Sequence, residues 1–305
     1  ASIRYIIFIY FTLTALAASI FIGISLYSRL SGQMSATIRE ENQILINQIT
    51  RSMEDYLRTV MKLSDSLYYG VVKNADLASG SIGSEMTLLY DNNKDNVENI
   101  ALLSKEGKLL EAVPAARLKT NVDVTGENWF TSTLEKTENM HFSTPHIQNL
   151  FDDATLRYYW VISLSRIVEL TDGGDSRLGV LLVDMDYASV SRMMQQINTA
   201  GNGQYYYLCD SEGEIIYHPR QAQINDGIGS ENSIEIAGYG EGVYDEDFGG
   251  EKRKVIVNTI SYTGWKLVGV IPYSTFTKGM INLRYFITML MLLMAMMLVI
   301  VNRVI

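Results

Sequence analysis

The residues best suited to chemistry gather in the middle of the chain. Trp129, His146, Gln148, Tyr159 and Asp184 combine two kinds of aromatic ring with an imidazole, an amide and a carboxylate. Asp184 stands in the apolar run VLLVDM, where a buried carboxylate needs hydrogen-bond donors or a cationic ligand. The competing interpretation is that the aromatic residues are ordinary core and that Asp184 caps a local turn.

Strand alternation divides the aromatic run around these residues. It sends Tyr158 and Trp160 to one face and Arg157 and Tyr159 to the other. One pair is then free to join the core while the other lines a cavity.

Signs of catalysis are weak. His141 and His146 are five residues apart with Pro145 between them, which is not the spacing of a zinc-binding helix. The sequence has no G-x-S-x-G, P-loop or H-E-x-x-H motif. Cys209, the single cysteine, lies in an apolar strand and reads as a buried structural thiol. We expect no catalytic residue and no cofactor in this segment.

One stretch has part of a calcium-binding pattern. Asp91, Asn93 and Asp95 have the 1, 3, 5 spacing of an EF-hand loop. Asn96 replaces the glycine and Leu102 replaces the bidentate glutamate that such a loop needs. A solvated turn is the better interpretation, and no metal site is expected.

Composition limits the class of partner. The formal net charge is -9, which argues against nucleic-acid binding because phosphates require clustered positive charge. With 47% hydrophobic residues, the chain is not intrinsically disordered.

Two uncharged stretches predict transmembrane helices. Tyr5 to Tyr27 is about 34 Å long as a helix, enough for a bilayer core of about 30 Å. Tyr285 to Val301 is shorter but still within the spanning range. A signal peptide is the alternative for the first stretch, but the stretch is too long for one and no A-x-A site follows. We expect a multi-pass bacterial membrane protein with residues 28–284 outside the cytoplasm.

A long helix is expected to leave the membrane. From Ser28 to about Val72 there is no proline, and apolar residues recur every three or four positions. This stripe comprises Ile49, Met53, Tyr56, Val60, Leu63 and Leu67. The same spacing suits packing on a sheet of this chain or a seam against a second copy of it. We favour packing on a sheet for the far half of the helix and a homodimer contact for the part nearest the membrane.

The rest of the soluble part predicts two similar sheets. The runs LLSKEGKLL and LCDSEGEIIYHP both read as hairpins, and an offset of 106 superimposes their Glu-Gly turns. Further strands are expected over 156–168, 178–185, 242–248, 254–261 and 265–272, with a helix over 126–136 and another starting after Asp186. The predicted domains are a first span (1–27), a long helix (28–75), a membrane-distal ligand-binding lobe (76–199), a membrane-proximal lobe (200–284) and a second span (285–305).

This order of elements resembles the double Cache (dCache) sensor regions of bacterial receptors. The two hairpins, the run ISLSRIV and the strand LGVLLVDMD carry the resemblance. It implies an α+β fold with two PAS-like antiparallel-sheet lobes threaded by one long N-terminal helix and flanked by two transmembrane helices. It also implies extracytoplasmic binding of a small molecule in the distal lobe.

The resemblance also implies roles for particular residues. In the amino-acid-binding branch, an Arg-x-Trp-Tyr element holds the ligand carboxylate, and a Tyr-x-Asp element with a strand-end Asp holds the ammonium. Trp129 matches the Trp of the first element, and Asp184 matches the strand-end Asp. In the first element Glu127 replaces the Arg and Phe130 replaces the Tyr. In the Tyr-x-Asp element His146 replaces the Tyr and Gln148 replaces the Asp. A ligand carboxylate would face Glu127, so we expect a cationic amine or a neutral polar ligand stacked on Trp129 rather than an α-amino acid.

The expected function is the sensor region of a transmembrane receptor, most like a sensor histidine kinase whose output domain lies past Ile305. A chemoreceptor or diguanylate cyclase is the alternative output. A membrane-anchored scaffold that binds a protein and no small ligand is the alternative of a different class, and an open cavity in the distal lobe would argue against it.

Overall fold

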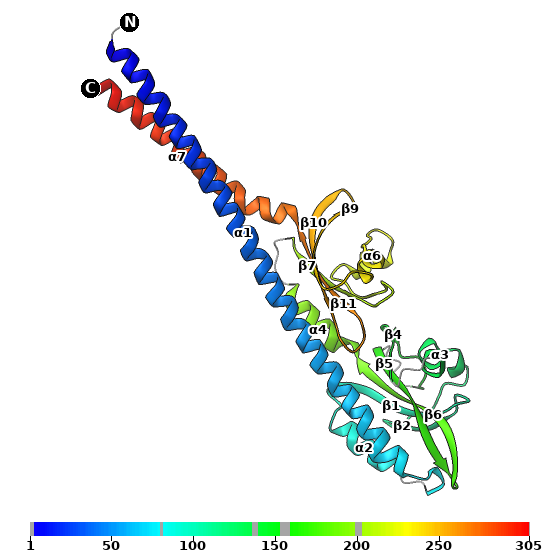
Figure 1. The fold of residues 1–305 in the computed structure, drawn as a ribbon. Helices are drawn as coiled ribbons and strands as arrows, with labels where there is room; N and C mark the ends of the chain where they lie inside the picture. The colour runs from blue at the N-terminus through cyan, green and yellow to red at the C-terminus, as the bar shows by residue number, and fades with distance from the viewer. Residues whose placement is uncertain (1–2, 80–81, 136–139, 153–158, 199–202, 305) are drawn as a thin grey trace.

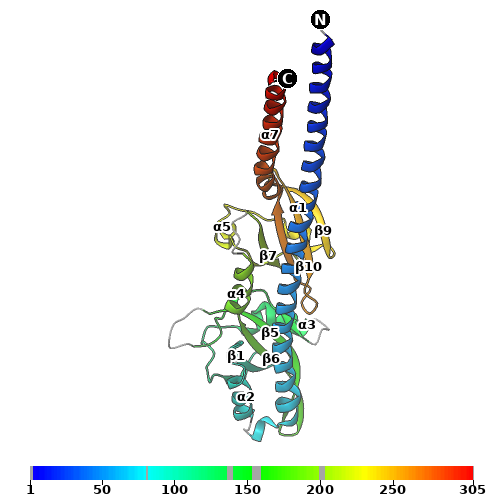
Figure 2. The same ribbon diagram turned by 90° about the vertical axis from the view of Figure 1, so that its left-hand side faces the viewer.

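The chain forms a long helical rod with two antiparallel sheets along its second half (Figure 1). This computed structural model describes residues 3–79, 82–135, 140–152, 159–198 and 203–304. Helix α1 runs unbroken from Ile3 to Asp65, and α7, Tyr273–Val304, lies beside its first half in both views (Figures 1 and 2). The predicted α+β architecture with apolar helices at both ends is confirmed.

The two terminal helices are candidate membrane spans. Each contains a stretch long and apolar enough to cross a bilayer, and only 6% of that stretch is buried within the protein. The helices approach closely at Gly23, where an added Cβ would lie 3.0 Å from the Met291 sulfur. Glycine permits this approach because it has no side chain.

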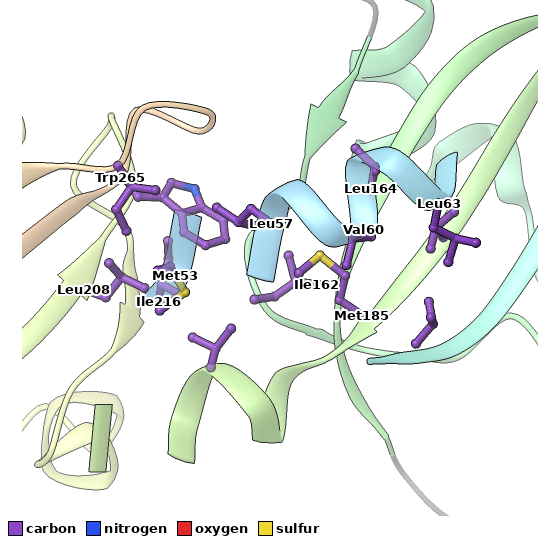
Figure 3. Close-up of a cluster of buried hydrophobic side chains, with 14 of the residues drawn as sticks. Met53, Leu57, Val60, Leu63, Ile162, Leu164, Met185, Leu208, Ile216 and Trp265 are labelled. Atoms are coloured by element: carbon purple, nitrogen blue, oxygen red, sulfur yellow. The ribbon is translucent and has the colours of Figure 1, made fainter. Parts of the chain in front are cut away.

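The far half of α1 provides the core of both lobes. Met53, Val60 and Leu63 from the predicted stripe are buried, and so is Leu57, which the stripe omitted. Figure 3 shows these side chains meeting residues of both sheets, among them Met185 of the distal sheet and Leu208 of the proximal sheet. The stripe therefore packs within the chain, as predicted for this half of the helix. Beyond Asp65 the helix becomes a π-helix, Ser66–Val71, and then a 3-10 turn, Val72–Asn74.

The distal sheet has the order β2-β1-β6-β5-β3, and β4 also pairs with β5. Its strands are β1 (Val97–Ser104), β2 (Leu109–Val113), β3 (His141–Phe142), β4 (His146–Ile147), β5 (Trp160–Asp172) and β6 (Asp175–Asp186). The short helix α2, Ile82–Asp91, packs on its inner face with α1. On β6, Leu181, Val183 and Met185 point toward α1, so Val180, Leu182 and Asp184 point outward.

The proximal sheet repeats this topology with the order β8-β7-β11-β10-β9. Its strands are β7 (Tyr205–Cys209), β8 (Ile215–Tyr217), β9 (Gly242–Phe248), β10 (Glu251–Thr259) and β11 (Lys266–Pro272). Helix α4, Tyr187–Ile197, connects the lobes, and the predicted cap is present: the Asp186 carboxylate accepts from the Ala188 N–H at 2.8 Å. The internal repeat expected from the two Glu-Gly hairpins is confirmed by this shared order.

The outer face of the proximal sheet is filled by a buried charged network. Arg253 on β10 donates to Glu231 at 2.5 Å and to Glu246, and it donates to the Tyr205 hydroxyl at 3.0 Å. Tyr205 and His218 also contact the Glu231 carboxylate, at 2.7 and 3.3 Å. The segment with α5 (Gln221–Asn225) and α6 (Ser233–Ala237) lies between β8 and β9 and supplies Glu231. Burial alone would raise the pKa of Glu231, but these hydrogen bonds and the Arg253 charge hold it at about 2.

The shared core predicts the effect of shortening one side chain. Leu57→Ala should lower the free energy of unfolding by about 2–5 kcal/mol, because it removes buried methyl groups between the two lobes. Ile44→Ala, on the same helix but 58% exposed, is the matched control and should change it by about 0.5 kcal/mol or less. Urea unfolding followed by tryptophan fluorescence measures both; equal effects would contradict the assignment of Leu57 to the core.

The Glu231 network predicts acid sensitivity. Because the folded-state pKa lies below the unfolded-state value, the stabilisation is complete above about pH 4.5 and is lost as the pH falls toward 2. The loss should amount to about 3 kcal/mol. Glu231→Gln should flatten this part of the stability–pH curve, whereas the exposed Glu251→Gln should leave it unchanged. Parallel curves for wild type and Glu231→Gln would rule out the network as the cause.

Candidate ligand-binding site

Asp184 is the centre of a polar cluster on the outer face of the distal sheet. The strand register places Asn99 on β1 and Ser163 on β5 directly beside it. Such cross-strand neighbours have Cβ atoms about 5 Å apart, within reach of a short hydrogen bond. Asn99 Nδ2 donates to Asp184 Oδ2 at 2.9 Å, and Ser163 Oγ donates to Oδ1 at 2.5 Å. Asp184 was predicted as a site residue, whereas Asn99 and Ser163 were not.

The predicted residues on the segment before β5 complete this cluster. Gln148 Nε2 donates to Asp184 Oδ2, and its backbone N–H donates to the Tyr159 carbonyl at 2.8 Å. His146 reaches Asp184 indirectly, because its Nε2 lies 3.3 Å from Ser163 Oγ. Four of the five predicted site residues, Asp184 included, thus meet here, although Tyr159 contributes only its backbone.

Asp184 is fully buried. Burial raises the pKa of Asp184, and the hydrogen bond from Ser163 and the charge of the nearby His146 oppose that rise. Among the ion pairs formed by the described residues, none includes Asp184. Its carboxylate is therefore held by neutral donors and has no direct cationic partner in the described part of the chain.

Trp129 lies on α3, Asn128–Glu135, and its backbone contacts Ser165 of β5. It is 3% exposed and packs edge-on against Phe130 at 5.6 Å between ring centres. Its carbonyl accepts from Thr133 Oγ1 at 2.7 Å and from Ser165 Oγ at 3.3 Å. Trp129 therefore belongs to the outer core of the distal lobe, and it also borders the cavity described next.

A cavity of about 910 Å³ opens between the two lobes. Its distal wall comes from α3, β3 and β4, and Figure 1 shows α3 and β4 on the side of the distal lobe nearest the proximal lobe. Its proximal wall comes from the β7–β8 turn and residues 262–265. The cavity was expected within the distal lobe alone, but it extends to the proximal lobe. Trp129, His146, Phe142 and Trp265 are among its lining residues, and the Phe142 and Trp265 rings lie 6.4 Å apart.

The charge of the lining is one-sided. Glu127, Asp210, Glu212 and Glu214 line the cavity, while the described lining residues include no lysine or arginine. Burial raises the pKa of Glu214, and the charges of Asp210 and Glu212 raise it further. Such a wall attracts cations and repels carboxylates.

For Tyr159 and Trp160, the two described residues of the aromatic run, the expected division between core and cavity is not observed. The Trp160 side chain is 51% exposed, and its ring centre lies 6.3 Å from that of Tyr187. Trp160 therefore does not join the core, and it is not among the cavity-lining residues. The reason is its place at the very start of β5, where the sheet ends and solvent begins. Arg157 and Tyr158 lie outside the described residues. Tyr159 is half-buried, and its side chain is not part of the cavity wall.

Known chemotaxis proteins share sequence with this chain. The methyl-accepting chemotaxis protein TlpB of Bacillus subtilis is 23% identical over 230 residues, which cover 73% of this chain and 32% of TlpB. The chain thus spans about a third of the length of this curated relative.

Solved chemoreceptor domains share the fold. The ligand-binding domain of Campylobacter jejuni Tlp3, in complex with 4-methylisoleucine, has a TM-score of 0.58 at 15% identity, covering 80% of this chain and 94% of that domain. The Pseudomonas aeruginosa amino acid chemoreceptor PctC, in complex with GABA, gives 0.53 at 15% identity, covering 74% of this chain and 95% of that domain. The Cache-domain model dCache_1 matches residues 30–280. This match, together with two sheets of the same strand order on one long helix, shows that the chain belongs to the dCache family of Cache domains.

Proposed function

We propose that this chain is the extracytoplasmic sensor region of a membrane-spanning chemoreceptor. Membership of the dCache family and the two apolar terminal helices support a sensor held at a membrane. The chemotaxis relatives favour the chemoreceptor alternative over the sensor histidine kinase that we first expected. This proposal also includes the domain boundaries predicted from the sequence, two membrane crossings and a homodimer.

The ligand class that we propose is a cationic amine, with a neutral polar compound as the second candidate. The observation that carries this choice is the cavity wall with four carboxylates and, among its described residues, no lysine or arginine. The domains of similar fold were solved with GABA and 4-methylisoleucine, and such carboxylate-bearing ligands would face Glu127 here. An open cavity of this size also favours a receptor over a scaffold, which could fill the space with its own side chains.

The signal would leave the proximal lobe through α7. This helix begins at Tyr273, immediately after β11 ends at Pro272. A ligand bound between the lobes would shift their equilibrium by its difference in affinity for the two arrangements. Because no linker separates the last strand from α7, a change in the proximal sheet would be passed directly to the second span.

A thermal-shift screen of the full chain in lipid nanodiscs tests this proposal. Amines should raise the melting temperature, because binding at 100 times Kd adds about 2.7 kcal/mol to the free energy of unfolding. Glu127→Gln and Asp184→Asn should reduce or abolish the shift. Trp160→Ala, which changes an aromatic residue outside the cavity, is the control and should keep it.

The other outcomes of this screen are equally informative. A response to α-amino acids but not to amines would show that the proposed ligand class is wrong. No response from a well-folded chain across amines, amino acids, sugars and carboxylates would favour the scaffold.

A further inference from the structure

His146, Ser163 and Asp184 form a continuous polar chain from the cavity to the buried carboxylate. His146 lines the cavity, Ser163 is fully buried, and Asp184 lies behind it. The two links are Nε2 to Oγ at 3.3 Å and Oγ to Oδ1 at 2.5 Å. The protons available to these atoms decide which links can form hydrogen bonds.

The other ring nitrogen of His146 must carry a hydrogen. Nδ1 lies 3.0 Å from the carbonyl oxygen of Thr144, which can only accept. It also lies 3.3 Å from the Ser143 hydroxyl, whose single proton is donated to the same carbonyl at 2.9 Å. Both neighbours are therefore acceptors toward Nδ1, and Nδ1–H is the donor.

The Ser163 hydroxyl has one proton for two contacts. If the imidazole is neutral with its hydrogen on Nδ1 and Asp184 is ionised, one contact places two lone pairs against each other. One additional proton removes this conflict in either of two ways. In the first, the proton is on Nε2, so the imidazolium donates to Ser163 and Ser163 donates to Asp184. In the second, the proton is on Asp184, so the carboxylic acid donates to Ser163 and Ser163 donates to Nε2.

The charges around the chain favour keeping that proton. Asp184 has no ion-pair partner among the described residues, and an ionised carboxylate at full burial is costly without one. Glu98 on β1 is an anionic neighbour that further disfavours the ionisation of Asp184, and the hydrogen-bond donors Asn99 and Gln148 are neutral. With the extra proton the triad is electrically neutral.

On the cavity side, the charged and titratable residues of the described wall that share the cavity with His146 include Glu127, Asp210, Glu212, Glu214 and His141.

We propose that His146, Ser163 and Asp184 share one exchangeable proton and that a cationic head group bound in the cavity beside His146 displaces it. The proton leaves to solvent through His146, and the positive charge of the cation takes the place of the charge that the proton carried. Ser163 is the positioning residue that couples the two titrating groups. The exchange rests on the proposed amine-binding function, whereas the shared proton does not.

The shared proton is tested without any ligand. The three histidines of the full chain, labelled with 13C in their rings and studied in nanodiscs, are titrated by NMR, and His146 is assigned by its loss in His146→Gln. Asp184→Asn and Ser163→Ala should lower the midpoint of the His146 titration by about one pH unit or more, because either change removes the partner of the protonated ring.

Two matched variants separate coupling from general damage. Ser163→Thr keeps the hydroxyl and should retain the wild-type midpoint. Ser165→Ala removes an equally buried hydroxyl two residues along the same strand, bonded to Thr133 rather than Asp184, and should also retain it. An unchanged midpoint in both Asp184→Asn and Ser163→Ala, or an equal shift in Ser165→Ala, would overturn the shared proton.

The exchange is tested by calorimetry with 1,4-diaminobutane in phosphate and in Tris, two buffers that differ in ionisation enthalpy. Below the midpoint, close to one proton should be released per bound diamine, and affinity should rise by up to about tenfold for each unit by which the pH is raised toward the midpoint. Binding without proton release would overturn the exchange. No diamine binding would refute the exchange and the amine class together, while the NMR midpoints would still decide whether the proton is shared.

Discussion

Both lobes depend on burial of one face of α1. Neither sheet closes on itself, so each must cover its inner face with another element, and both use the same helix. A fully buried aliphatic side chain contributes about 1.5–3 kcal/mol, and Met53, Leu57 and Val60 contribute this at the point where the two lobes meet. The position of one lobe relative to the other is consequently set by side chains of a single rigid element.

The two outer faces use the same topology in opposite ways. In the proximal lobe, Arg253 supplies a positive charge from within the chain, and Glu231 and Glu246 enclose it. In the distal lobe, Asp184 faces outward with neutral donors and no ion-pair partner among the described residues. Because its charges are paired within the chain, the outer face of the proximal sheet is a structural element. On the outer face of the distal sheet, the Asp184 carboxylate lacks a positive charge, which a ligand or a proton could supply.

Periodic features of the sequence were predictable, and pairings between distant segments were not. The stripe on α1, the two Glu-Gly hairpins and the Asp186 cap depend on residues a few positions apart, and local spacing revealed them. Asp184 was recognisable because a carboxylate interrupts an apolar strand. Ser163 and Asn99 were missed because only the register of three strands brings them to Asp184. The proximal cavity wall, with Glu212 and Trp265, arises from contact between lobes and has no local signature.

The unbroken course of α1 has a consequence for changes in chain length. The helix is 63 residues long, about 95 Å, and it joins the apolar end to the distal lobe without a hinge. Inserting a single residue before the buried stripe would rotate everything beyond it by about 100° relative to the first span. Seven inserted residues would nearly restore the rotational phase and would move the lobes about 10 Å farther out. Length variants of such a helix are therefore restricted by angle more than by distance.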